Sequence, residues 1–265
     1  MAKNKKSNKN GSASGKNDAD APVLPLFYQQ PMPLDAKKHA SLSMKKNFGF
    51  AFTEHVNAVP INAVEMPQVA NYYPIAFSSD DQATPVAILG LRDRENLFID
   101  AEGMWDPNCY IPAYIRRYPF IFSEIPNTDK LALCIDNSDE IIEESDAQPF
   151  FDKKGEMSAL STNALEFCKS YHSATQKTLE FSKALVEHDL LVQREAKINI
   201  GENRRINFSG FNIVDEEKFN ALDDKVFVEW RKKGWLPIVY AHLFSGMQWQ
   251  RLSRLLNERL EKEAA

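Results

Sequence analysis

The stretch SALSTNALEFCKSYHSATQKTLEFSKALVEHD, residues 158–189, decides the fold class of this chain. Apolar and small side chains recur in it every three or four positions, at Leu160, Ala164, Cys168, Tyr171, Thr175, Leu179, Ser182 and Val186. This spacing is typical of an amphipathic helix that packs one face against a core. We therefore predict one long helix here, and the chain on either side of it must supply that core.

Before this helix, between Phe48 and Asp136, the chain carries short apolar runs separated by Pro, Gly and Asp. The runs are residues 73–77, 85–91, 97–100, 118–122 and 131–136. Runs of this length between turn residues predict strands of a mainly antiparallel sheet. Residues 100–103, Asp-Ala-Glu-Gly, predict a turn, and residues 111–117 predict one or two helical turns with Pro112 in the first turn.

After the long helix, residues 196–200 and 205–213 flank Gly-Glu-Asn at 201–203, which predicts a hairpin. Asp215 before two glutamates predicts the N-cap of a helix over 216–222. Further helices are expected over 225–233, ending at Gly234, and from Pro237 to about Glu261. A β-rich N-terminal half with a mainly antiparallel sheet, followed by a helix-rich C-terminal half, predicts an α+β fold.

Composition divides the 265 residues into two parts. Residues 1–21 carry five lysines and two aspartates, a charge of +3. Because the whole chain has a net charge of −5, the remaining residues carry −8. No large apolar side chain follows Met1 in this stretch, so ordering it would bury too little surface to offset the entropy lost. We expect a disordered basic tail over 1–22 and one domain over 23–265.

Several broad classes are disfavoured by the same sequence. An acidic body is a poor nucleic-acid binder, and we expect no nucleic-acid partner. No run of 18 apolar residues and no apolar stretch of a secretory signal occurs, so we expect no membrane span and a soluble, cytoplasmic protein. Three separated cysteines, Cys109, Cys134 and Cys168, are compatible with reduced thiols in that compartment.

The centre of the chain carries five motifs: PVAILGLR at 85–92, NLFID at 96–100, GMW at 103–105, YIPAYIRRYPF at 110–120 and LCID at 133–136. Together they resemble the bacterial SapC family. Weaker similarity lies at 27–28, 33–35, 210–211 and 235–243, so the resemblance spans roughly residues 23–255.

The resemblance implies a bacterial protein from a family named after loci for crystalline surface layers. It implies no defined reaction. Some relatives are encoded beside outer-membrane receptors, halogenases and cupin-type oxygenases, which points to peptide or nutrient handling. A peptide-transporter permease that shares the name would need several membrane spans, so the resemblance is not to that protein.

The densest group of side chains able to recognise a ligand is Arg92, Asp100, Trp105, Tyr110, Arg116 and Arg117. Guanidinium groups bind carboxylate or phosphate, and aromatic rings supply a stacking wall. The alternative is structural: one arginine pairs with Asp100 or Asp136 while the aromatic rings fill the core. Because adjacent side chains diverge in a helix or a strand, Arg116 and Arg117 should have different roles.

Catalytic and metal-binding patterns are absent from the sequence. The five histidines are dispersed, and no HExxH, GxSxG, GxGxxG or GxxxxGK motif occurs. His242, on an apolar helix face, is expected to be a core histidine. We therefore expect no metal and no cofactor, and a non-catalytic accessory or binding protein for a peptide, an envelope component or a protein partner. The alternative is a metal-independent enzyme of unknown substrate; the sequence does not decide the oligomeric state.

Overall fold

The computed structural model describes residues 24–264 except 47, 126–127, 129 and 201–203. The predicted tail over 1–22 and the predicted turn at 201–203 lie outside these described residues. Within them, strands gather mostly in the N-terminal half and helices in the C-terminal half, so the α+β prediction is confirmed.

Three antiparallel sheets make up the β structure of the described chain. The largest has five strands in the order β3-β5-β4-β10-β9. Its strands are β3 (Ala58–Pro60), β5 (Pro85–Ile88), β4 (Ile75–Ser78), β10 (Arg204–Val214) and β9 (Leu191–Ile200). The predicted hairpin is thus the β9–β10 pair, which begins five residues earlier than expected and joins the edge of this sheet through β10 and β4.

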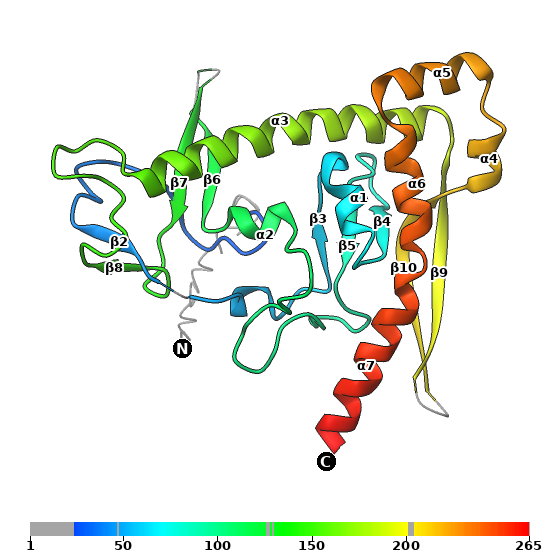
Figure 1. The fold of residues 1–265 in the computed structure, drawn as a ribbon, viewed down its shortest axis with the longest axis horizontal. Helices are drawn as coiled ribbons and strands as arrows, with labels where there is room; N and C mark the ends of the chain where they lie inside the picture. The colour runs from blue at the N-terminus through cyan, green and yellow to red at the C-terminus, as the bar shows by residue number, and fades with distance from the viewer. Residues whose placement is uncertain (1–23, 47, 126–127, 129, 201–203, 265) are drawn as a thin grey trace, which may run out of the picture.

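Two smaller sheets lie toward the other end of the molecule (Figure 1). One has the order β1-β7-β6, with β1 (Pro31–Pro33), β7 (Leu131–Asp136) and β6 (Phe120–Glu124). The other pairs β2 (Leu42–Met44) with β8 (Ile142–Glu144). The sequence predicted β6 and β7 but not β1, whose two prolines are tolerated because it is an edge strand.

The long helix α3 (Ala159–Glu187) runs across both ends of the molecule (Figure 1). It begins where the Ser158 side chain accepts a hydrogen bond from the Ser161 N–H, an ordinary N-cap. Cys168 packs in one hydrophobic cluster with the two smaller sheets, whereas Phe181 and Leu185 pack in a second cluster with the large sheet. The helix therefore ties the two clusters together, as its predicted apolar face required.

The remaining helices are short, apart from the last. They are the 3-10 turns η1 (Ala51–Thr53) and η2 (Ala63–Glu65), then α1 (Met66–Val69), α2 (Ala113–Arg117), α4 (Glu216–Asn220), α5 (Asp224–Lys233), α6 (Leu236–Ser245) and α7 (Gln248–Ala264). Asp215 caps α4 as predicted, accepting from the N–H groups of Glu217 and Lys218. Gly234 ends α5 with a left-handed φ of 73°, which favours glycine.

Two predictions about the elements are wrong. Residues 97–100 form turns with a single bridge between Ile99 and Trp105, because side chains take over the backbone groups. The Asn96 Oδ1 accepts from Phe98 N, and the Arg259 guanidinium donates to the carbonyls of Asn96 and Ile99. These side chains, one local and one from the distant α7, thus occupy backbone groups that a strand would share with a neighbouring strand.

The expected single helix after Pro237 is two helices, α6 and α7. At the junction, Gly246 N and Met247 N donate to the carbonyls three residues earlier, Leu243 O and Phe244 O, both at 3.2 Å. Such bonds tighten the turn and redirect the chain, and glycine weakens a helix at this point. The apolar periodicity continues through the break, which is why the sequence pattern did not show it.

Candidate functional site

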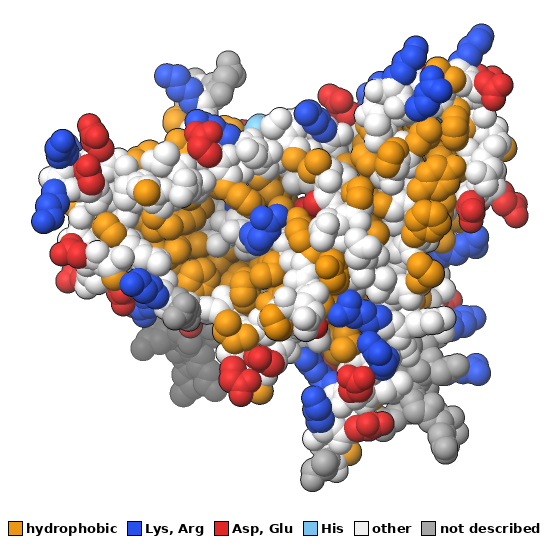
Figure 2. Space-filling view, viewed as in Figure 1, with side chains coloured by type: hydrophobic (Ala, Val, Ile, Leu, Met, Phe, Trp, Pro, Cys, Tyr) orange, Lys and Arg blue, Asp and Glu red, His pale blue; other side chains and the backbone are white. Residues whose placement is uncertain are grey.

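A pocket of about 410 Å³ opens between α2 and the segment that follows β2. We call it the aromatic pocket and define it by its lining residues: Met44, Lys45, Lys46, Phe48, Gly49, Phe50, Phe52, Met104, Ile115, Arg116, Tyr118 and Gln148. In the space-filling view, hydrophobic side chains gather in a hollow beside α2, with basic side chains near it (Figure 2). Its volume falls in the range of small-molecule sites.

Aromatic rings form the wall of this pocket. Phe52 stacks on Tyr118 with ring centroids 4.3 Å apart, and Phe48 and Phe50 lie 6.2 and 6.3 Å from Phe52. The segment is fixed because Phe50 N donates to Gly103 O at 2.8 Å. A side chain at Gly103, where φ is 74°, would approach Ala51 Cβ to 2.9 Å, so glycine permits this close approach.

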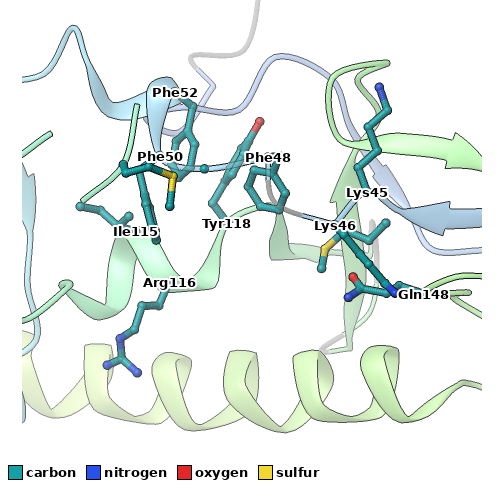
Figure 3. A pocket seen from close by; sticks show the side chains of 12 residues that line it. Lys45, Lys46, Phe48, Phe50, Phe52, Ile115, Arg116, Tyr118 and Gln148 are labelled. Atoms are coloured by element: carbon teal, nitrogen blue, oxygen red, sulfur yellow. The ribbon is translucent and has the colours of Figure 1, made fainter. Parts of the chain in front are cut away.

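Basic groups flank the aromatic wall on two sides. Figure 3 shows Arg116 from α2 on one side of the rings, and Lys45, Lys46 and Gln148 on the other. Lys45 Nζ donates to Asp139 O at 2.6 Å. No acidic side chain belongs to the lining among the described residues. Apolar rings between cations suit a ligand that joins an apolar body to an anionic group.

Arg116 is held in place by a chain of hydrogen bonds. Its Nε donates to Ile111 O at 2.9 Å, and its Nη2 donates to the Tyr110 hydroxyl at 2.8 Å. That hydroxyl donates in turn to Glu65 Oε2 at 2.8 Å, and the same oxygen accepts from Ala113 N at the start of α2. Burial, and secondarily Glu65, raises the pKa of Tyr110 to about 12, so the hydroxyl keeps its proton.

These hydrogen bonds leave one end of the Arg116 guanidinium available to a ligand. The Arg116 side chain is exposed, and its guanidinium carbon lies 5.3 Å from the ring centroids of Tyr110 and of Phe167 on α3. No described residue accepts from its Nη1 at hydrogen-bond distance. A guanidinium oriented at two of its nitrogens and free at the third can bind a carboxylate without losing much further side-chain entropy.

Arg117 has a different environment. Its guanidinium carbon lies 4.4 Å from the Tyr171 ring, 4.7 Å from the Tyr114 ring and 5.8 Å from the Tyr28 ring. Tyr28 and Tyr114 are buried, and burial raises the pKa of all three tyrosines, that of Tyr171 to about 12. The cation is therefore stabilised by neutral rings rather than by a carboxylate.

The structure does not bring the six predicted site residues together. Tyr110 and Arg116 adjoin each other, and Arg117 lies among its tyrosines. Asp100 and Trp105 line a separate pocket of about 600 Å³ against α7. Arg92 forms ion pairs with Glu95 and Glu263. Only Arg116 of the six lines the aromatic pocket.

The expected pairing of an arginine with Asp100 or Asp136 is wrong. Asp100 accepts from the backbone N–H groups of Glu102 and Met104, which closes the predicted turn. Asp136 is fully buried and accepts from Gln29 N, Gln30 N and the Tyr118 hydroxyl. Backbone N–H groups, joined at Asp136 by the Tyr118 hydroxyl, thus take the place of an arginine partner at both carboxylates.

The cysteines and histidines give no sign of a reactive centre. Burial raises the pKa of Cys109 and Cys168 to about 11, so both remain thiols at neutral pH and are weak nucleophiles. Within the described part of the chain, no three His, Cys, Asp or Glu side chains converge as metal ligands would. His242 is 4% exposed, a core histidine as predicted, and its Nε2 accepts from Val214 N at 3.0 Å.

Sequence reasoning missed most of the aromatic pocket. Its main signal is the alternation Phe48-Gly49-Phe50-Ala51-Phe52, separated by one position from the lysine pair at 45–46. The segment is not a strand, yet its three rings line the same pocket, and the lysines supply charge beside them. Glu65, which orients Arg116 through Tyr110, lies 45 positions before that tyrosine, and no local pattern connects the two.

The fold and the pocket together define an α+β protein with an aromatic pocket flanked by basic side chains. Comparison with known families places it further: the chain belongs to the SapC family, whose family model matches residues 34–252. No curated protein and no solved structure matches the chain. Among the described residues, no helix is both long enough and apolar enough to cross a membrane.

Proposed function

We propose that this SapC-family protein is a non-catalytic binding protein that holds a peptide through the aromatic pocket. The observation that carries the proposal is that Arg116 lines the same pocket as the Phe48, Phe50 and Phe52 rings, in a lining without acidic side chains. A peptide with a free carboxylate and an apolar or aromatic side chain matches this combination. The carboxylate pairs with a cation while the side chain enters the ring-lined space.

The proposed cellular role is accessory, in handling peptides or other anionic components of the bacterial cell envelope or surface layer. The family resemblance supports this setting. We further propose that the protein acts in the cytoplasm, with residues 1–22 as a basic tail ahead of one domain over 23–265. Recovery of the native protein in the membrane fraction, released only by detergent, would contradict this location.

The binding test uses dipeptides with a C-terminal phenylalanine as probes, measured by isothermal titration calorimetry. The expected result is binding by the parent protein, with a loss of about tenfold in affinity when the C-terminal carboxylate is replaced by an amide. Arg116→Gln should lower affinity for the acid by a similar factor and leave affinity for the amide unchanged.

The matched control is Arg254→Gln, since Arg254 is also an exposed arginine on a helix and pairs with Glu258 outside the pocket. It should bind as the parent does. Equal affinity for the acid and the amide, or equal effects of Arg116→Gln and Arg254→Gln, would show that the pocket does not recognise a carboxylate.

A further inference from the structure

The helix α6 begins beside α3 (Figure 1), and residues of both helices line a second, separate groove. We call it the α3–α6 groove. It has a volume of about 650 Å³ and is lined by Ala63, Val64, Lys169, Ser170, Ser173, Ala174, Lys177, Lys233, Trp235 and Ile238. None of these residues lines the aromatic pocket.

The helical spacing of α3 builds one wall of the groove. Lys169, Ser173 and Lys177 are four positions apart, so their side chains lie above one another on one helix face. The opposite wall comes from Trp235 and Ile238 at the start of α6, with Lys233 from the end of α5. Trp235 is held by edge contacts with Phe181 and Trp230, at 5.8 and 5.4 Å between ring centroids.

Hydrogen bonds fix the end of the groove. Ala63 N donates to Thr178 Oγ1 at 2.9 Å, and the hydroxyls of Thr175 and Thr178 approach Asn62 Oδ1 at 3.2 and 3.3 Å. These bonds join η2 to α3 and hold Val64 over the groove. A site whose walls are already held in place loses little conformational freedom when it binds a ligand.

The charged groups that line the groove are all basic. Lys169 pairs with Glu166 at 2.7 Å and Lys233 with Glu229 at 2.6 Å, in both cases between exposed side chains. Exposed pairs of this kind contribute little, so an arriving anion can compete for the ammonium groups. Among the described residues, Lys177 has no ion pair, and the hydroxyls of Ser170 and Ser173 have no hydrogen-bond partner.

An apolar surface accompanies these cations. Val64 is 75% exposed, more than any other large hydrophobic side chain in the described part of the chain. Trp235 forms a buried floor, and Ile238 is half-buried beside it. A ligand with an apolar part would cover this surface, and the hydrophobic effect would stabilise the complex. An inorganic anion would leave the same surface exposed to water.

We propose that the α3–α6 groove binds an anionic amphiphile, a molecule that joins a phosphate or carboxylate group to an apolar body. The ammonium groups of Lys169, Lys177 and Lys233 and the hydroxyls of Ser170 and Ser173 receive the anion. Val64, Trp235 and Ile238 contact the apolar body. This site and its ligand are independent of peptide binding in the aromatic pocket.

The test measures binding of decyl phosphate, kept below its micelle-forming concentration, to the full chain by calorimetry. Inorganic phosphate and decanol carry the two halves of the ligand separately. The expected result is that each half binds at least tenfold more weakly than decyl phosphate. Equal binding of decanol and decyl phosphate would overturn the proposal, because the lysines would then have no role.

Substitutions of groove residues test whether the ligand binds in the groove. Lys177→Gln should weaken decyl phosphate binding about tenfold, and Lys177→Arg should retain it. Ser173→Trp should fill the exposed groove and abolish binding, with circular dichroism to confirm the fold. Lys183→Gln, on the same helix but outside the groove, is the matched control and should bind as the parent does.

Arg116→Gln separates the two sites. Any decyl phosphate held in the aromatic pocket is weakened by this change, whereas the tenfold effect of Lys177→Gln should persist in the Arg116→Gln protein. If Arg116→Gln weakens binding and Lys177→Gln does not, the amphiphile occupies the aromatic pocket and the proposal is wrong. Co-sedimentation with phosphatidylglycerol vesicles then distinguishes the source of the anion. Sedimentation of the parent but not of Ser173→Trp identifies a lipid headgroup, and monomer binding without sedimentation identifies a free amphiphile.

Discussion

Arg116 and Arg117 are adjacent in α2, yet their guanidinium groups lie in opposite environments. Arg116 is exposed, donates to Ile111 O and the Tyr110 hydroxyl, and lines the aromatic pocket. Arg117 is half-buried among Tyr28, Tyr114 and Tyr171. The divergence follows from helix geometry, in which consecutive side chains point about 100° apart.

This divergence predicts that glutamine substitutions at the two positions have separate effects. Arg117→Gln should lower the free energy of unfolding by about 1–3 kcal/mol, because the cation–π contacts with partly desolvated rings are lost. Arg116→Gln should change it by less than about 0.5 kcal/mol, as is usual for an exposed side chain. Urea denaturation of both variants measures the difference. Equal stability losses would show that the tyrosine rings do not hold Arg117.

Local patterns predicted the elements whose ends are set by neighbouring residues. Ser158 begins α3 and Asp215 begins α4 because each side chain caps N–H groups within three positions. The apolar runs at 85–91 and 131–136 contain β5 and β7 because burial on both faces needs such runs. In these places the information needed to define the element lies inside it.

Contacts between distant segments could not be predicted in the same way. Residues 97–100 look like a strand, but Arg259 in α7 takes up two of the carbonyl groups around them. The aromatic pocket joins Phe52 to Tyr118, which are far apart in the chain, through ring stacking. A single sequence does not show which distant residues pack together. The six predicted site residues therefore include only one residue that lines the aromatic pocket, Arg116.

Gly90, in the PVAILGLR motif, has no room for a side chain, so its substitution should destabilise the protein strongly. A Cβ at this position would lie 2.0 Å from Glu95 O, which is backbone and cannot rotate away. Gly90→Ala should therefore force the 90–95 loop to shift and lower the free energy of unfolding by about 3 kcal/mol.

Gly210→Ala is the matched control for this effect. Gly210 has a φ of 87°, but a Cβ there meets nothing within 4 Å. Its substitution should cost only the backbone strain, about 1 kcal/mol. Denaturation midpoints of the two variants decide the matter: a Gly90→Ala protein as stable as Gly210→Ala would mean that the loop accommodates a methyl group freely.

Asp136 predicts a second stability effect, through the three groups that its carboxylate accepts. Asp136→Ala would leave Gln29 N, Gln30 N and the Tyr118 hydroxyl without their acceptor in a buried region. The expected loss is about 3 kcal/mol, whereas Tyr118→Phe, which removes one donor, should cost about 1 kcal/mol. If thermal melts show Asp136→Ala to be no less stable than Tyr118→Phe, the carboxylate does not hold the N-terminal segment through the Gln29 and Gln30 amides.

His242 predicts a pH dependence of stability. It is 4% exposed in α6, its Nε2 accepts from Val214 N, and its ring lies 5.0 Å from the Phe77 ring. Burial lowers its pKa from 6.5 to about 4 in the folded protein. Between those two values the unfolded chain binds a proton at this position and the folded protein does not. The free energy of unfolding should therefore fall as pH decreases from 6.5 to 4, and His242 stops contributing to the fall below about 4.

The full contribution of His242 over this range is about 3 kcal/mol. His242→Gln provides the test, because its amide nitrogen and oxygen can replace the neutral ring without titrating. Urea denaturation at pH 7.0 and 4.5 measures how much the free energy of unfolding falls between these two values. The fall should be about 2 kcal/mol smaller for the variant than for the parent. His188→Gln is the control, since it changes an exposed histidine and should keep the parent's pH response. Parallel pH profiles for the parent and His242→Gln would mean that the buried ring accepts a proton in the folded protein as readily as in the unfolded chain.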